Sequence, residues 1–214
     1  MRKKIGTFLM IIGVLLVLGA LGLLVYNRQE AAKAQKNTEQ LLPRILAEIE
    51  SKKQEKAETE GVEEVPELPQ AWEEFMDKEP EEMPVVELDG QKYIGYLSIP
   101  SLQLDLPVMS DWSYKQLKQA PCRYTGNVSQ DNLVVMAHNY EYHFGGLKDL
   151  SQGENIFFTD MNGEITIYEV VARDILNPVA IEEVTENNYD LTLFTCTYGG
   201  QSRVTVYCNR AKGN

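Results

Sequence analysis

The sequence predicts an all-β barrel that follows an N-terminal transmembrane helix and a helical stalk. Three observations lead to this architecture. An apolar run of about 22 residues without a charge extends from Ile5 to Tyr26. After Asp89 and Gly90, short alternating segments follow one another with turn residues between them, which is typical of a closed barrel. Two of these segments flank Gly199-Gly200 and predict a β-hairpin.

The N-terminal run is long enough to cross a membrane as a helix and too long for the apolar region of a typical signal peptide. Residues 1–4 form a short tail that contains Arg2, Lys3 and Lys4, so the positive-inside rule places the N-terminus in the cytoplasm. We therefore expect a single-pass protein of the cell membrane, with residues 5–26 in contact with lipid and the remainder outside. A cleavable signal is the alternative, but no small-x-small cleavage site follows the run.

Residues 27–60 predict an amphipathic helical stalk, because one stripe of apolar side chains recurs at helical spacing: Leu41, Leu42, Ile45, Leu46 and Ile49. Such a helix serves as a spacer or lies against the barrel or a second copy. Pro43 lies within the stripe and is expected to kink the helix or to begin a new one.

Residues 61–90 predict an acidic linker, since four prolines occur among many glutamates and little apolar surface is available for burial. Trp72 and Phe75 are its aromatic residues, and they are candidates for a lid over the barrel. The barrel itself is expected over residues 91–214. Its predicted strands are 93–99, 102–108, 133–137, 155–158, 164–173, 191–197 and 203–209, with helical turns at 114–119 and 147–150.

Composition excludes some functions and favours others. The net charge of −12 argues against nucleic-acid binding, because phosphate contacts need clustered Lys and Arg. Three cysteines in an exported chain leave at least one thiol unpaired, which favours a reactive cysteine over a disulfide framework. Cys208 alternates with core valines and is expected to be buried, and Cys122 is expected to be buried in a loop.

The predicted hairpin places a thiol beside a cation. If Gly199 and Gly200 form a two-residue turn, Cys196 stands directly opposite Arg203, with their Cβ atoms about 5 Å apart. A neighbouring positive charge stabilises the thiolate, which is the nucleophilic form of cysteine. Cys196 is therefore the candidate nucleophile.

The residues around this cysteine resemble those of the sortase family. Thr192-Leu193-Phe194-Thr195-Cys196 matches the family pattern Thr-Leu-x-Thr-Cys, and Arg203 opens the following strand as the family's arginine does. His138 follows the apolar run 133–137 at a strand end, in the position of the family's histidine. The resemblance extends over about residues 91–210 and implies an eight-stranded sortase-type barrel with short helices.

The resemblance also implies roles for these residues and partners for the protein. Cys196 is expected to attack the carbonyl of the Thr in an LPxTG-like sorting signal and to form a thioacyl intermediate. His138 then acts as the acid and base, Arg203 stabilises the developing oxyanion, and Thr195 lines the substrate groove. The acceptor is an amine of a cell-wall precursor or of a pilin. The short segment 174–190 favours a class A or class D-like enzyme.

We expect no resident cofactor or metal. Some sortases bind calcium through acidic loop residues, and Glu182, Glu183 and Glu186 are the candidates here, with a solvated loop as the simpler interpretation. His143, in a loop, is a weaker catalytic candidate than His138. Two alternative functions are a non-catalytic β-barrel adaptor of the cell envelope and a papain-like peptidase. The second fits poorly, because His precedes Cys and Cys lies on a strand.

Overall fold

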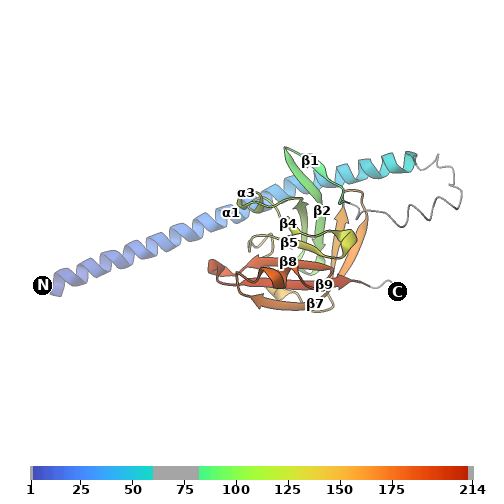
Figure 1. Cartoon of the computed structure of the whole chain (residues 1–214). Coiled ribbons are helices and arrows are strands. Elements are labelled where there is room, and N and C mark those ends of the chain that lie inside the picture. The colour runs from blue at the N-terminus through green and yellow to red at the C-terminus, as the bar shows by residue number, and fades with distance from the viewer. Residues whose placement is uncertain (1, 60–81, 212–214) are drawn as a thin grey trace.

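The computed structural model describes residues 2–59 and 82–211, and Trp72 and Phe75 lie outside the described residues. A long helix precedes a compact β domain (Figure 1). The helices and strands are α1 (Arg2–Thr59), β1 (Val86–Leu88), β2 (Gln91–Ile99), β3 (Leu104–Met109), α3 (Tyr114–Leu117), β4 (Cys122–Thr125), β5 (Leu133–Met136), β6 (Asn155–Asp160), β7 (Ile165–Leu176), α4 (Ile181–Thr185), β8 (Leu191–Cys196) and β9 (Arg203–Arg210).

The strands form a closed barrel, as predicted. Their order is β1-β2-β3-β4-β5-β8-β9-β7-β6, and a further pairing of β2 with β6 closes the ring, so eight strands enclose the core and β1 pairs with β2 outside the ring. Gly95 permits this closure: its φ is +145°, and a Cβ there would lie 2.0 Å from the carbonyl oxygen of Thr159 on β6. Only a residue without a side chain allows β2 and β6 to approach so closely.

All seven predicted strands are present, together with two strands, β1 and β4, that the sequence pattern does not predict. β1 falls in the segment for which a linker is predicted, and β4 begins at Cys122, for which a loop is predicted. Both are short, and β4 contains an irregularity between Arg123 and Thr125, so neither shows a clean alternation of apolar and polar residues. The one-turn helix α4 was missed as well.

The predicted two-residue turn at Gly199-Gly200 is wrong, although its flanking register is right. A 3₁₀ turn over Tyr198–Gly200 connects β8 to β9, and the N–H of Gly200 donates to the carbonyl of Thr197. Thr197 and Ser202 close the loop through a backbone hydrogen bond of 2.8 Å. The paired residues Cys196 and Arg203 therefore remain opposite each other.

The barrel is filled by alternating side chains from every strand of the ring except β4. Its largest fully buried members include Leu97, Leu106, Leu133, Phe158 and Tyr168. Each fully buried Leu or Phe of this kind contributes about 1.5–3 kcal/mol through the removal of apolar surface from water. This core fixes the strand edges from which the candidate functional residues project.

Helix α1 runs without interruption from Arg2 to Thr59, through Pro43, so no second helix begins there. Its first part is long and apolar enough to cross a membrane. Its second part lies on the barrel, where Ile45 and Ile49 pack with Tyr93, Met109 and Leu117 in a second apolar cluster. Arg44 forms an ion pair with Asp89 in the turn between β1 and β2. Part of the predicted stripe therefore docks on the barrel, through Ile45, Ile49 and the partly buried Leu41, whereas Leu46 is exposed.

Candidate active site

Three neighbouring strands bring Cys196, His138 and Arg203 to one edge of the sheet. Cys196 is the last residue of β8 and pairs with Arg203, the first residue of β9, which confirms the predicted register. On its other side β8 pairs in parallel with β5, and Met136 is the partner of Phe194. His138 lies two residues after Met136, and Cys196 lies two residues after Phe194. If the parallel register continues past the end of β5, His138 is the neighbour of Cys196.

Hydrogen bonds continue the β5–β8 contact past the last paired residues. The N–H of Ala137 donates to the carbonyl of Phe194 (3.3 Å), and the hydroxyl of Thr195 donates to the carbonyl of Ala137 (2.8 Å). Adjacent strands lie about 4.8 Å apart, and residues in register on neighbouring strands project from the same face. His138, two residues beyond the end of β5, thus lies in a row with Cys196 on β8 and Arg203 on β9, which we call the catalytic row.

Cys196 is the accessible thiol of the chain. It is exposed, whereas Cys122 and Cys208 are buried as predicted, and all three are free of disulfides. Burial raises the pKa of each buried thiol to about 12. These two cysteines are therefore protonated at neutral pH and shielded from reagents, which leaves Cys196 as the thiol that a substrate can reach.

His138 is half-buried, and this burial lowers the pKa of its imidazole and favours the neutral form. Desolvation lowers its pKa below the ordinary value, the nearby charge of Lys118 lowers it further, and Glu30 on α1 opposes both effects. Among the described residues, its Nε2 atom is buried and has no hydrogen-bond partner. A neutral, unpartnered ring nitrogen beside a thiol can accept a proton and later return it.

The loop after His138 holds the ring in place. The carbonyl of His138 accepts a hydrogen bond from the N–H of Phe144 (3.1 Å), and the ring of Tyr140 lies 4.9 Å from the imidazole, centroid to centroid. Tyr140 also contacts His143 at 5.5 Å. His143 is fully buried, and burial lowers its pKa to about 4, with a smaller effect from His138. His143 is therefore neutral at physiological pH and packs behind Tyr140, one ring removed from His138.

Arg203 lies over the ring of Phe194, and one of its N–H donors has no partner among the described residues. Its guanidinium carbon is 5.1 Å from the centre of the Phe194 ring, a cation–π contact that holds the group beside Cys196. Its Nε atom is buried and has no partner among the described residues. A guanidinium donates hydrogen bonds but accepts no proton, so this group suits the stabilisation of negative charge.

Thr195 faces the inside of the barrel and is buried. Its hydroxyl donates to the carbonyl of Ala137, so this donor is already used within the protein. The side chain instead ties β8 to β5 immediately before Cys196 and His138. Thr195 borders the groove described next, but it is better placed to position the catalytic row than to bind a ligand.

A groove of about 630 Å³ opens beside Cys196. The hairpin contributes Thr195, Thr197 and Val204 to its wall, and the loop after β5 contributes a polar wall that contains Asn139, Glu141, Gly145, Gly146, Lys148 and Asp149. Its volume lies in the range of small-ligand and short-peptide sites. On the outer side of the row, the rings of Phe194, Tyr124 and Trp112 follow one another at 5.4 and 5.7 Å.

Several residues around the row could not be predicted from the sequence. Tyr124 and Trp112 carry no motif, and Glu30 and Lys118 reach His138 from segments distant in the sequence. The position of Phe194 could have been predicted, because strand alternation places its side chain on the same face of β8 as that of Cys196. The glutamates considered for calcium, Glu182, Glu183 and Glu186, are exposed, and no group of three or more His, Cys, Asp or Glu that could hold a metal occurs in residues 2–59 and 82–211.

The sequence and the fold are both similar to those of known proteins. A family model described as "Sortase domain" matches residues 97–211. Sortase A of Bacillus anthracis is 30% identical over 115 residues, which cover 51% of this chain and 54% of the relative, so the chain spans about half the length of the curated relative it matches. Sortase C2 of the Group B Streptococcus pilus island 1 is 26% identical over 59% of this chain and 77% of its own, with a TM-score of 0.50. Sortase A of Corynebacterium diphtheriae shares the fold, with a TM-score of 0.52 at 19% identity over 88% of this chain and 94% of its own.

Proposed function

The chain belongs to the sortase family, and from this premise we propose that it is a membrane-anchored cysteine transpeptidase. It cleaves an LPxTG-like sorting signal and transfers the acyl group to an amine of a cell-wall precursor or a pilin. The catalytic row carries this proposal: His138 follows the end of β5, and Cys196 and Arg203 lie on the adjacent strands β8 and β9. Residues 5–26 form the anchor, and the basic residues before them favour a cytoplasmic N-terminus.

Acylation begins with a proton transfer from the thiol of Cys196 to the neutral imidazole of His138. The thiolate attacks the carbonyl carbon of the signal's Thr, and the carbonyl oxygen becomes an oxyanion that accepts hydrogen bonds from Arg203. The tetrahedral intermediate then collapses, the peptide C–N bond breaks, and the imidazolium of His138 gives its proton to the leaving amine. The product is a thioester on Cys196.

Deacylation repeats these steps with an amine as the attacking group. His138 accepts a proton from the amine as it attacks the thioester, and Arg203 again stabilises the oxyanion. The C–S bond then breaks, and the imidazolium of His138 returns its proton to the departing sulfur of Cys196, which restores the thiol and the neutral imidazole. Water can replace the amine, so slow hydrolysis of the sorting peptide is expected when no acceptor is present. The row needs no metal for either half-reaction, and we propose that chelators leave the rate unchanged.

A thiol-alkylating probe tests the proposal against a non-catalytic adaptor. The reagent should label Cys196 much faster than Cys122 and Cys208, because only Cys196 is exposed. Cleavage of a fluorogenic sorting peptide should disappear in Cys196→Ala and His138→Ala. An adaptor without activity would instead show no peptide turnover in the wild-type protein, whatever peptide of a sorting-signal library is offered.

A further inference from the structure

The catalytic end of the barrel faces the N-terminal part of α1. Met109 pairs with Cys122, Cys122 with Met136, and Met136 with Phe194, so the segments that follow β3, β5 and β8 leave the sheet at one end. These segments contain α3, the loop after His138 and the β8–β9 turn. Figure 1 shows α3 and this turn on the side from which α1 runs toward the N-terminus.

An ion pair fixes α1 to this end of the barrel. Glu30 lies 3.7 Å from the ammonium of Lys118, next to α3, and 2.8 Å from that of Lys33, and its side chain is only 15% exposed. Ala34, one turn further along α1, is fully buried. Besides burial, the charges of Glu30 and Tyr26 raise the pKa of Tyr140, so this part of α1 lies near the loop after His138.

The apolar run therefore ends close to the catalytic row. Its last residue is Tyr26, and Glu30 follows four residues later, a rise of about 6 Å along an α-helix. Since α1 is one continuous helix, no flexible spacer separates the run from the docked part. The continuous helix therefore holds the barrel with its catalytic end toward the end of the apolar run at Tyr26.

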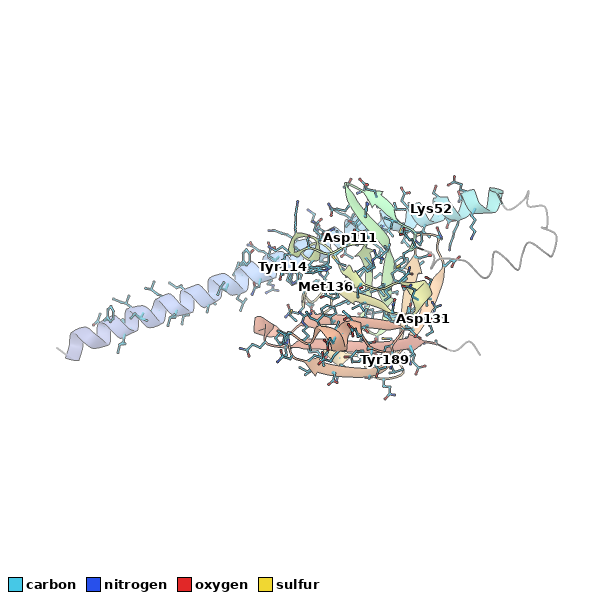
Figure 2. All side chains as sticks on the ribbon, viewed as in Figure 1. Lys52, Asp111, Tyr114, Asp131, Met136 and Tyr189 are labelled. Carbon is cyan, nitrogen blue, oxygen red and sulfur yellow. The ribbon has the colours of Figure 1, made fainter. Side chains whose placement is uncertain are left out.

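Three exposed aromatic side chains lie at the same end. Trp112 is 40% exposed, Tyr114 is 77% exposed and Tyr142 is 38% exposed, and the rings of Trp112 and Tyr114 meet edge to face at 6.0 Å. Figure 2 shows Tyr114 on the side of the barrel that faces the N-terminal part of α1. Large aromatic side chains with a polar tip are enriched at the boundary between lipid and water, where both ends find a suitable environment.

The charges of this end also suit a lipid headgroup layer. Lys115 and Lys118 belong to α3 and its end, Arg28 and Lys33 follow the apolar run on α1, and Lys148 lies in the loop after His138. The acidic groups of the same segments are Glu30, Asp111, Glu141 and Asp149, and Glu30 pairs with both Lys33 and Lys118. Basic side chains next to a membrane span are attracted to anionic lipids. The chain as a whole carries a net charge of −12, whereas acidic and basic groups nearly balance at this end, so it does not repel an anionic surface as the rest of the chain does.

We propose that the catalytic end of the barrel rests on the membrane, with Trp112, Tyr114 and Tyr142 in the lipid headgroup layer. This inference rests on the proposed anchor and adds a second membrane contact to it. Cys196 then works at the bilayer surface, within reach of sorting signals and amines that are themselves held close to the membrane. A barrel that merely swings on its anchor would have no such fixed orientation.

Fluorescence of Trp112 in the full chain tests this contact. The protein has two tryptophans, so a Trp72→Phe variant leaves Trp112 as the sole emitter. It is placed in nanodiscs of phosphatidylcholine and phosphatidylglycerol whose acyl chains carry bromine either near the headgroup or near the methyl end. We expect loss of Trp112 emission with the shallow bromine and a smaller loss with the deep one. Emission equal to that in unbrominated nanodiscs overturns the inference.

A matched control places the tryptophan at the other end of the barrel. Ile165 is 61% exposed and begins β7, the strand whose last residue, Leu176, pairs with Arg203. In Trp72→Phe/Trp112→Phe/Ile165→Trp, neither bromine position should reduce emission. Equal quenching at both positions would show non-specific contact and overturn the inference. Failure of the chain to enter nanodiscs would overturn the proposed anchor too, whereas entry without quenching of Trp112 removes the second contact alone.

Discussion

Replacing Arg203 with Met is expected to slow the acylation of Cys196 by about 10²–10³-fold, or roughly 3–4 kcal/mol of transition-state stabilisation, the effect typical of a lost oxyanion donor. The buried Nε of Arg203 has no partner among the described residues, so its hydrogen bond remains to be made in the transition state. The Met side chain can still cover Phe194. Only a cation–π contact of about 0.5–1 kcal/mol is lost from the folded state, so catalysis should suffer far more than stability.

The assay is single-turnover cleavage of a fluorogenic sorting peptide, with thermal unfolding of the same samples as the control for folding. The rate constant of acylation should fall while the concentration of peptide at half-saturation changes little, because the donor acts on the oxyanion. Arg203→Lys should be intermediate, since it keeps the charge but loses the planar contact with Phe194. A fall of less than tenfold in a folded Met variant would refute the role of this side chain.

Three further predictions concern the neighbours of the catalytic row. Lys118→Gln should raise the pKa of His138 and move the acidic limb of the acylation profile to higher pH, because the positive charge of Lys118 now lowers that pKa; an unmoved limb would contradict this. Thr195→Val should remove about 1 kcal/mol of hydrogen bonding to Ala137 and lower kcat without changing KM, and Thr195→Ser should restore the rate; a change in KM alone would point to substrate binding instead. His143 has a folded pKa of about 4 against an unfolded value of 6.5, so the stability that it contributes is complete above pH 6.5 and is lost as the pH falls toward 4, by about 3 kcal/mol in all. Thermal unfolding of His143→Phe should therefore depend less on pH in this window than that of the wild type, and equal dependence would rule the explanation out.

The sequence was sufficient for the barrel and the catalytic row because their signals are local. Alternation around Cys196 and Arg203 fixes both the faces of the strands and their register, and this register survived even though the turn between them has a different shape. The end of an apolar strand likewise placed His138 at a strand edge. Such patterns depend only on neighbours within a few residues.

The sequence was not sufficient for contacts made between distant segments. Glu30 approaches His138 only because α1 lies along the barrel, and its docking stripe includes small residues such as Ala34 that do not stand out as apolar. Thr195 shows the same limit: it lies in the wall of the groove, as the motif suggests, but the hydrogen bond from its hydroxyl to Ala137 on the neighbouring segment could not be predicted. β4 was missed because its pairing with β5 is irregular.

Mass spectrometry of the acyl-enzyme tests the central claim most directly. The full chain is mixed with a sorting peptide, quenched in acid within one turnover and digested, and the acyl group is located by fragmentation. We predict that the mass of the N-terminal part of the peptide, up to its Thr, appears on Cys196 and disappears when an amine acceptor is added. An adduct on Cys122 or Cys208, or cleavage of the peptide by a Cys196→Ala variant, would contradict the account.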